Sequence, residues 1–150
     1  MTSQRQPSIS ISASPSEDPE KMRKVMKRHI ENVFGESDDI ARSKAMEPLY
    51  HEDVTWFQPG EYSGEHAIIR GRDNVNATIQ KEQNQFPEFY ITHDNEGYIA
   101  VTQNLGIVHW KLGPHEQPDM IKACHYLLFE DGKVKAFWTA HLKMPDGSMP

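Results

Sequence analysis

The chain has 150 residues, which is long enough for one domain with a sizeable hydrophobic core. Its formal net charge of -6 argues against nucleic-acid binding, which requires a basic face, and no local cluster of lysine and arginine residues compensates. The single cysteine rules out an intrachain disulfide, and no apolar run is long enough to span a membrane. We therefore expect a cytoplasmic protein whose partners are neither nucleic acids nor membranes.

The composition changes along the chain and divides it into three parts. Residues 1–17 form a tail rich in serine and proline that has almost nothing to bury, so we expect it to be disordered. Residues 18–144 are expected to fold as one α+β domain, and residues 145–150 to form a flexible C-terminal tail.

Three helices are predicted in the first half of the domain. Asp18 before Pro19 is a typical helix start, an N-cap acceptor followed by proline at the first helical position, and Gly35 ends this helix. Acidic caps and proline stops mark two further helices in the same way. The predicted helices cover residues 19–34, about 39–49, and 73 to about 85.

His29 lies on the apolar face of the first predicted helix. The apolar residues have the i, i+3, i+4 spacing of a buried helix face and are Met22, Val25, Met26, Ile30 and Val33. An imidazole that points to the interior needs a hydrogen-bond partner or a cavity, because an unpaired buried polar group is costly. His29 is therefore either a satisfied core histidine or part of a functional pocket.

The remaining segments are rich in β-branched and aromatic residues and are predicted to be strands. Turn clusters at residues 94–97, 113–114 and 130–132 separate them. The predicted strands are Val54–Phe57, Phe89–His93, Tyr98–Leu112, Met120–Phe129 and Val134–Leu142. Helices followed by a long meander indicate an α+β protein rather than the βαβ alternation of a nucleotide-binding sheet.

Four short segments resemble one known family. They are the helical segment Met26–Glu31, the segment Leu49–Trp56 that enters the first strand, the loop Gly71–Val75 and the hairpin His125–Val134. Together they are similar to the nuclear transport factor 2-like superfamily and, within it, to the SnoaL-like and ketosteroid isomerase-like group. The resemblance covers about residues 19–142 and implies a cone-shaped bent antiparallel sheet wrapped around three N-terminal helices, with an apolar pocket inside. This fold hosts isomerases, cyclases, dehydratases, hydrolases and inert scaffolds, so it does not define the reaction.

The resemblance also implies which positions point into the pocket. His29 stands where the steroid isomerases place an oxyanion-hole tyrosine, and Gln58 stands where they place the proton-abstracting aspartate. Cys124 takes the position of the protonated aspartate that shares the oxyanion, and His141 lies at the matching rim of the last strand. All three catalytic groups differ, so the pocket can be carried over but the isomerase mechanism cannot.

These side chains limit the chemistry of the expected pocket. Gln58 can orient a substrate or a water molecule but cannot act as a base, and Cys124 in an apolar pocket should remain a thiol. His29 and His141 could transfer a proton near neutral pH from opposite walls, and the alternative for His141 is an exposed residue at a fraying strand end. The expected substrate-binding residues are Trp56, Trp110, Cys124, Tyr126 and Phe137.

Other groups of polar residues give weaker signals. The orientation of His109 stays open, because a bulge near residues 104–106 would reverse the alternation of its strand. The run His51-Glu52-Asp53 contains metal-ligand types, but three consecutive residues on a turn cannot face one ion, and the histidines lack ligand spacing. We therefore expect neither a metal nor another cofactor.

The sequence favours an enzyme that acts on a small apolar molecule, such as a polyketide- or terpenoid-like compound. We expect cofactor-independent acid–base chemistry of the isomerase, cyclase or dehydratase type, with His29 as the leading acid or base and Gln58 as an orienting donor. The alternative is a non-catalytic ligand-binding or dimerisation module of the same fold, since the carboxylates that relatives use are missing.

A homodimer is expected through the outward face of the sheet. An alternation that turns Cys124, Tyr126 and Leu128 inward exposes a band of apolar residues, which a monomer rarely leaves uncovered. This band consists of Ile121, Ala123, Leu127 and Phe129.

Overall fold

The computed structural model describes residues 17–59, 67–94 and 99–148. The tail expected over residues 1–17 lies outside this part of the chain except for Glu17, and so does Tyr98, at the start of one predicted strand. Within the described residues, no helix has both the length and the apolar composition needed to cross a bilayer.

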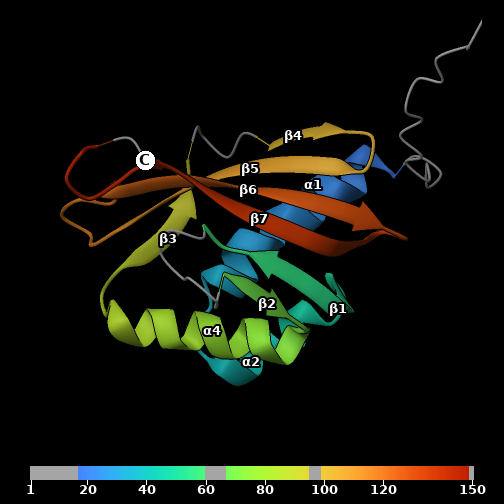
Figure 1. Cartoon of the computed structure of the whole chain (residues 1–150), viewed down its shortest axis with the longest axis horizontal. Helices are drawn as coiled ribbons and strands as arrows, with labels where there is room; N and C mark the ends of the chain where they lie inside the picture. The colour runs from blue at the N-terminus through green and yellow to red at the C-terminus, as the bar shows by residue number, and fades with distance from the viewer. Residues whose placement is uncertain (1–16, 60–66, 95–98, 149–150) are drawn as a thin grey trace, which may run out of the picture.

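The first and last helices pack against a curved sheet, and the short helix of residues 39–46 lies beyond the last one, away from the sheet (Figure 1). Helix α1 (Pro19–Arg28) begins after Asp18, whose carboxylate accepts a hydrogen bond from a backbone N–H of the first turn at 3.1 Å. The helix continues into a π-helical turn, η1 (His29–Phe34). Two further helices follow, α2 (Asp39–Met46) and α4 (Arg72–Gln85). The three predicted helices are therefore confirmed.

Seven strands form one curved, unclosed sheet. In chain order they are β1 (Tyr50–Phe57), β2 (Ile68–Arg70), β3 (Tyr90–His93), β4 (Ile99–Thr102), β5 (Leu105–Gly113), β6 (Ile121–Glu130) and β7 (Lys133–Lys143). Their order in the sheet is β2-β1-β7-β6-β5-β3, and β4 also pairs with β5. The α+β class and the cone-shaped fold are confirmed, although β1 and β7 run parallel and make the sheet mixed.

The π-helical turn η1 turns closely spaced helix positions to the interior. His29, Ile30 and Val33 are all buried. The wider turn closes at Gly35, whose backbone N–H donates to the carbonyl oxygen of Ile30 at 2.8 Å. A Cβ atom at Gly35 would lie 2.7 Å from the carbonyl oxygen of Glu31, so glycine is needed for this approach. Such turns are frequent at functional sites, because they move side chains out of the regular helical position.

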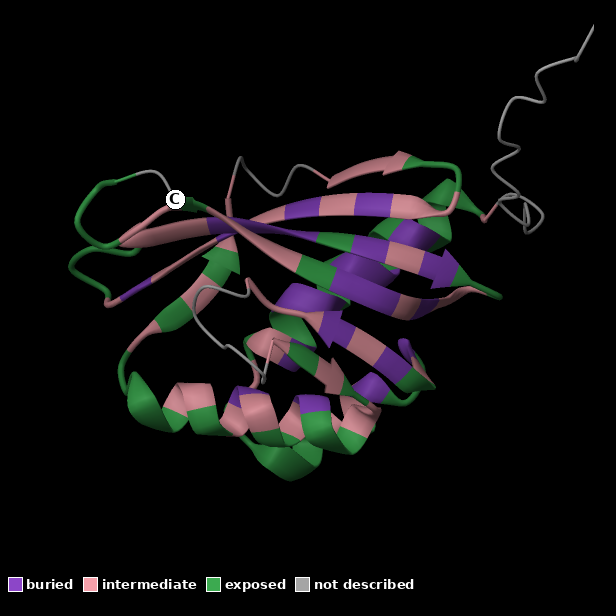
Figure 2. Cartoon of the chain, viewed as in Figure 1, coloured by how far each residue is buried: buried purple, intermediate pink, exposed green. Residues whose placement is uncertain are grey.

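Helix α1 packs directly over strand β5. A Cβ atom at Gly106 of β5 would overlap the sulfur of Met26, so the glycine allows the helix to approach the sheet this closely. Figure 2 shows the buried residues gathered where β1, β6 and β7 face α1. The core therefore lies between α1, η1 and the inner face of the sheet.

The single strand predicted over Tyr98–Leu112 is wrong. The segment forms a hairpin of β4 and β5, and its turn contains Gln103 in the left-handed region at a φ of 53°. The apolar residues on both alternations hid this turn, because neither Gly nor Pro marks it. Pairing with β4 covers the first half of β5, and pairing with β3 covers the second half.

The prediction of which β6 side chains point to the inner face of the sheet is also wrong. Ala123, Leu127 and Phe129 belong to the buried core, whereas the side chain of Tyr126 is 37% exposed. Both alternating sets of this strand are apolar, so the pattern alone could not choose between them, and an error of one residue exchanges the two faces. The apolar band proposed for the dimer is therefore the inner face of the sheet.

Candidate functional site

A cavity of about 960 Å³ opens between α4, the segment that follows it and the adjoining parts of strands β3, β5, β6 and β7. Its walls are mostly aromatic and aliphatic, and they include Phe34, Trp56, Ile79, Phe89, Trp110 and Leu112. Its polar side chains include Gln58, Glu82, Gln83, His125, Thr139 and His141. An apolar cavity of this size with a few polar groups is typical of a small-molecule site.

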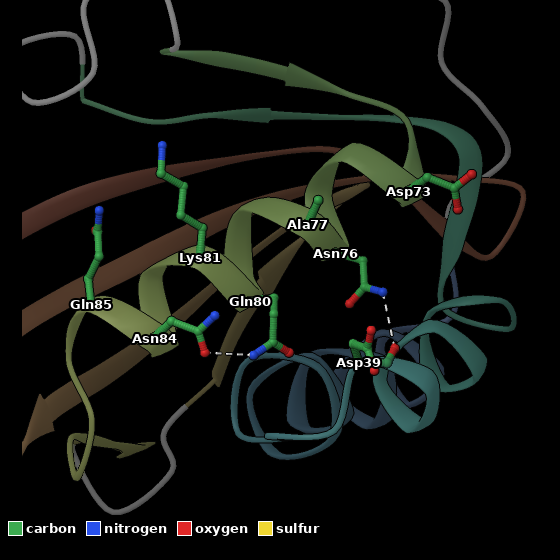
Figure 3. Close-up of a pocket in the computed structure, with 8 residues that line it drawn as sticks. All are labelled: Asp39, Asp73, Asn76, Ala77, Gln80, Lys81, Asn84 and Gln85. Carbon is green, nitrogen blue, oxygen red and sulfur yellow. Dashed lines mark hydrogen bonds between the residues drawn. The ribbon is translucent and has the colours of Figure 1, made fainter.

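A second hollow, of about 610 Å³, lies between α2 and α4 and has a polar lining (Figure 3). Its side chains already bond within the protein. Asn76 Nδ2 donates to the carbonyl oxygen of Asp39 at 3.1 Å, and Gln80 Nε2 donates to Asn84 Oδ1 at 3.0 Å. The first bond links the two helices and the second lies within α4, so we place the candidate site in the larger apolar cavity.

Three buried side chains form a hydrogen-bonded chain beneath the floor of this cavity. His29 comes from η1, Tyr50 from the start of β1 and His125 from the middle of β6, and all three are fully buried. The Nδ1 atom of His29 is hydrogen-bonded to the Tyr50 hydroxyl, and its Nε2 atom lies 2.7 Å from His125 Nδ1. The rings of Phe34 and Phe137 enclose His29, each with its centroid 5.0 Å from that of the imidazole.

His125 is the end of this chain nearest the cavity. His125 lines the cavity, and His29 lies one hydrogen bond behind it. Among the described residues, His125 Nε2 has no hydrogen-bond partner, although the atom is buried. The indole Nε1 atom of Trp110 is likewise buried and has no hydrogen-bond partner among the described residues. The Trp110 ring packs edge-on against that of His125, with ring centroids 5.4 Å apart. A bound molecule could satisfy both atoms, since buried polar groups are nearly always hydrogen-bonded.

Burial keeps this chain uncharged at neutral pH. It lowers the pKa of His29 from 6.5 to about 3, with a smaller contribution from His93. It also lowers the pKa of His125 well below the usual value, and nearby His29 and His141 lower it further. For the same reason, the pKa of the Tyr50 hydroxyl is raised well above its usual value. Both imidazoles and the phenol are therefore neutral.

The donors and acceptors of the chain favour one arrangement of protons. A neutral imidazole has one donor and one acceptor nitrogen. If the Tyr50 hydroxyl donates to His29 Nδ1, then His29 Nε2–H donates to His125 Nδ1, and His125 carries its own proton on Nε2. In the reverse arrangement the Tyr50 proton would have no acceptor among the described residues. The first arrangement gives both donors inside the chain an acceptor and leaves the Nε2–H group of His125, a residue that lines the cavity, without a partner among the described residues.

A second polar pair lies on the α4 side of the cavity. Gln58, just after β1, donates from Nε2 to Oε1 of Glu82 at 2.6 Å, and both side chains line the cavity. Burial raises the pKa of the Glu82 carboxyl, and the hydrogen bond from Gln58 opposes this effect in part.

The structure brings four of the eight predicted site residues to the cavity. Gln58, His141, Trp56 and Trp110 line it. Trp56 is fixed by a hydrogen bond from its Nε1 to Thr139 Oγ1 at 2.9 Å. Phe137 lies in the layer beneath, stacked on Trp56 with ring centroids 5.4 Å apart. The roles predicted for these residues stay predictions.

Cys124 and Tyr126 do not line the cavity, contrary to prediction. They alternate with the inward residues of β6, and Cys124 pairs across the sheet with His109, which places His109 on the outer face as well. The family resemblance placed Cys124 at the position of the second oxyanion aspartate, but the inward position is His125, one residue further on. Burial raises the pKa of the Cys124 thiol, in agreement with the expected protonated state.

Sequence reasoning missed three polar residues of the site, His125, Tyr50 and Glu82. His125 and Tyr50 lie in segments that carry the family resemblance, but nothing in their spacing reveals that they meet at His29. Glu82 lies on a helix with many polar residues, where one carboxylate gives no distinct signal. A histidine between apolar strand residues is the one usable sign, and it applies to His109 on the outer face as well as to His125.

The helices, the curved sheet and the apolar cavity define an α+β protein of the cone-shaped class. Residues 18–137 match the model of the SnoaL-like domain, so the chain belongs to the SnoaL-like family. Among proteins of curated function, none matches the sequence.

Several solved structures share this fold at low sequence identity. A candidate isomerase of the SnoaL-like family from Agrobacterium tumefaciens C58 is 13% identical over 81% of this chain and 97% of its own, with a TM-score of 0.70. A candidate SnoaL-like polyketide cyclase from Jannaschia sp. CCS1 is 10% identical over 85% and 91%, with a TM-score of 0.63. A candidate ketosteroid isomerase from Kribbella flavida DSM 17836 is 16% identical over 81% and 78%, with a TM-score of 0.57. At these identities the likeness shows the fold alone.

Proposed function

We propose that this protein is a cofactor-independent enzyme of the isomerase, cyclase or dehydratase type that acts on a small, largely apolar carbonyl compound. The observation that carries the proposal is the buried chain Tyr50–His29–His125, which ends at a residue that lines the cavity and whose Nε2 atom has no hydrogen-bond partner among the described residues. Structural neighbours described as an isomerase and a polyketide cyclase support the same kind of chemistry.

The His125 N–H group is suited to bind a carbonyl oxygen. When a proton leaves the carbon next to a carbonyl, negative charge develops on that oxygen, and a fixed donor in a dry site stabilises it. A neutral imidazole serves here as an electrophile and keeps its proton. His29 and Tyr50 hold the imidazole of His125 in the tautomer that donates.

The cavity lining favours a ring-containing substrate without charge. Aromatic side chains from η1, β1 and β5 surround the space, namely Phe34, Trp56 and Trp110. The neutral histidines supply no positive charge for an anion. A polyketide- or terpenoid-like ketone is the class that these walls fit best.

The proposal can be tested with 2-tetralone, an apolar bicyclic ketone with exchangeable α-protons. The full chain in D₂O should accelerate this exchange, followed by ¹H NMR, and His125→Phe should slow it by about 10²- to 10³-fold, the usual effect of removing one such donor. His109→Phe is the matched control, because His109 lies on the outer face of the same sheet, and it should behave like the parent protein. Binding of the ketone without faster exchange would favour a non-catalytic ligand-binding module instead.

A further inference from the structure

Glu82 is a carboxylic acid in the wall of a mostly apolar cavity. Its side chain is half-buried, and Gln58 Nε2 donates to Oε1 at 2.6 Å. No lysine or arginine of the described residues pairs with this carboxylate, and its Oε2 atom accepts no hydrogen bond from them. A carboxylate held by a single amide on one oxygen leaves the other oxygen free to act on a bound molecule.

The position of Glu82 is fixed from two sides. The next residue, Gln83, accepts a hydrogen bond from buried Arg42 at 2.6 Å and donates to the carbonyl oxygen of Glu36 at 2.9 Å. The backbone N–H of Gln58 donates to the carbonyl oxygen of Ala67 at 2.7 Å, which anchors the end of β1. Helix α4 and strand β1 thus hold the carboxylate and its amide partner in register.

The geometry points to Glu82 as the proton-accepting group of the cavity and to Gln58 as its positioning residue. This inference rests on the proposed function and deepens it. The cavity then has two functional groups, the N–H donor of His125 on β6 and the carboxylate of Glu82 on α4. The substrate class is a ketone with an acidic C–H next to its carbonyl group, bound with the oxygen at His125 and that C–H at Glu82.

The proposed step balances without an added reactant. Glu82 Oε2 takes the proton from the carbon next to the carbonyl, and the electron pair of that C–H bond forms a carbon–carbon double bond. The carbonyl π pair moves to oxygen, where the His125 N–H group stabilises the charge. The protonated Glu82 then returns its proton to another carbon of the conjugated system, or to a departing hydroxyl that leaves as water. The first outcome is an isomerisation and the second a dehydration.

The test uses the full chain and the exchange of 2-tetralone α-protons in D₂O. Glu82→Gln keeps the shape and removes the base, so exchange should slow by about 10²- to 10⁴-fold, the usual effect of one positioned proton-transfer group. Glu116→Gln is the matched control, because Glu116 is exposed on a loop outside the cavity lining, and it should not change the rate. Circular dichroism of each variant checks the fold.

The pH profile separates a positioning role of Gln58 from a structural one. The exchange rate should rise with pH as Glu82 loses its proton. Gln58→Leu removes the hydrogen bond that lowers the pKa of Glu82, so the rising limb should move to higher pH. If Gln58→Leu lowers the exchange rate but leaves the pH of the rising part of the profile unchanged, Gln58 has no positioning role.

The outcomes distinguish the two proposals. If His125→Phe slows exchange and Glu82→Gln does not, the proposed function stands and the role of Glu82 is wrong. If the parent protein does not bind 2-tetralone, or binds it without faster exchange, both proposals fail. Loss of exchange in both variants, with Glu116→Gln unaffected, is the expected result.

Discussion

Replacing His29 by phenylalanine should reduce both stability and turnover. The imidazole is fully buried and donates or accepts at both nitrogens. Phenylalanine removes both hydrogen bonds and leaves two polar atoms, Tyr50 Oη and His125 Nδ1, without partners in a dry interior.

The expected loss of stability follows from these two atoms. A buried group that loses its partner costs about 1–3 kcal/mol, so two such groups give roughly 2–6 kcal/mol. The larger ring between Phe34 and Phe137 adds strain in the same direction. Turnover per folded molecule should fall about 10²-fold, because His125 is no longer held in the tautomer that donates to the cavity.

Urea unfolding followed by tryptophan fluorescence measures the first effect, and exchange of 2-tetralone α-protons measures the second. The matched control is the double variant His29→Phe/Tyr50→Phe, which removes the stranded hydroxyl and should recover about 1–3 kcal/mol of the loss. Unfolding free energies of parent and His29→Phe that agree within about 0.5 kcal/mol would refute the hydrogen-bonded chain, since surface-like changes have that size.

Three further outcomes are expected from the same structure. The free energy of unfolding should fall as the pH decreases from 6.5 toward 3, because His29 takes up a proton in the unfolded chain but not in the folded protein. The slope is about 1.4 kcal/mol per pH unit for this group. Urea unfolding at successive pH values measures this slope, which should be smaller in His29→Phe. The outer sheet face, with Tyr126 and Trp138 each 37% exposed, should mediate a homodimer that Tyr126→Lys/Trp138→Lys converts to monomers, and a sedimentation run showing parent monomers at micromolar concentration would contradict this. Gly106→Ala should lower the unfolding free energy by about 1–3 kcal/mol, because the added methyl overlaps Met26 under α1, and an unchanged melting curve would contradict that packing.

The sequence predicts the helices and the turns of this fold well, because local chemistry specifies them. Asp18 caps α1 as expected, and the turn at Asp131–Gly132 has both residues in the left-handed region. The β4–β5 turn escaped prediction because Gln103 is not a typical left-handed residue. The parallel pairing of β1 with β7 depends on contacts distant in sequence, which no local pattern encodes.

The candidate site is less predictable because it depends on which residues meet. The apolar helix stripe predicts that His29 is buried, and the structure confirms it. The partner of His29 could not be predicted, because His125 is 96 residues away and its strand is apolar on both faces. The role predicted for Gln58, to orient a bound molecule, stays a prediction, and the hydrogen bond from its amide to Glu82 could not be predicted from the sequence. Long-range pairing, rather than side-chain chemistry, limited the sequence-based account.

The most direct test of the central claim is ¹⁵N NMR of the histidine side chains between pH 4 and pH 9. The central claim is that Tyr50 and His29 hold His125 neutral, with its proton on Nε2. We expect neither His29 nor His125 to titrate near 6.5, and the chemical shifts of His125 to be those of the Nε2–H tautomer. Titration of either ring near 6.5, or a His125 protonated on Nδ1, would contradict the account.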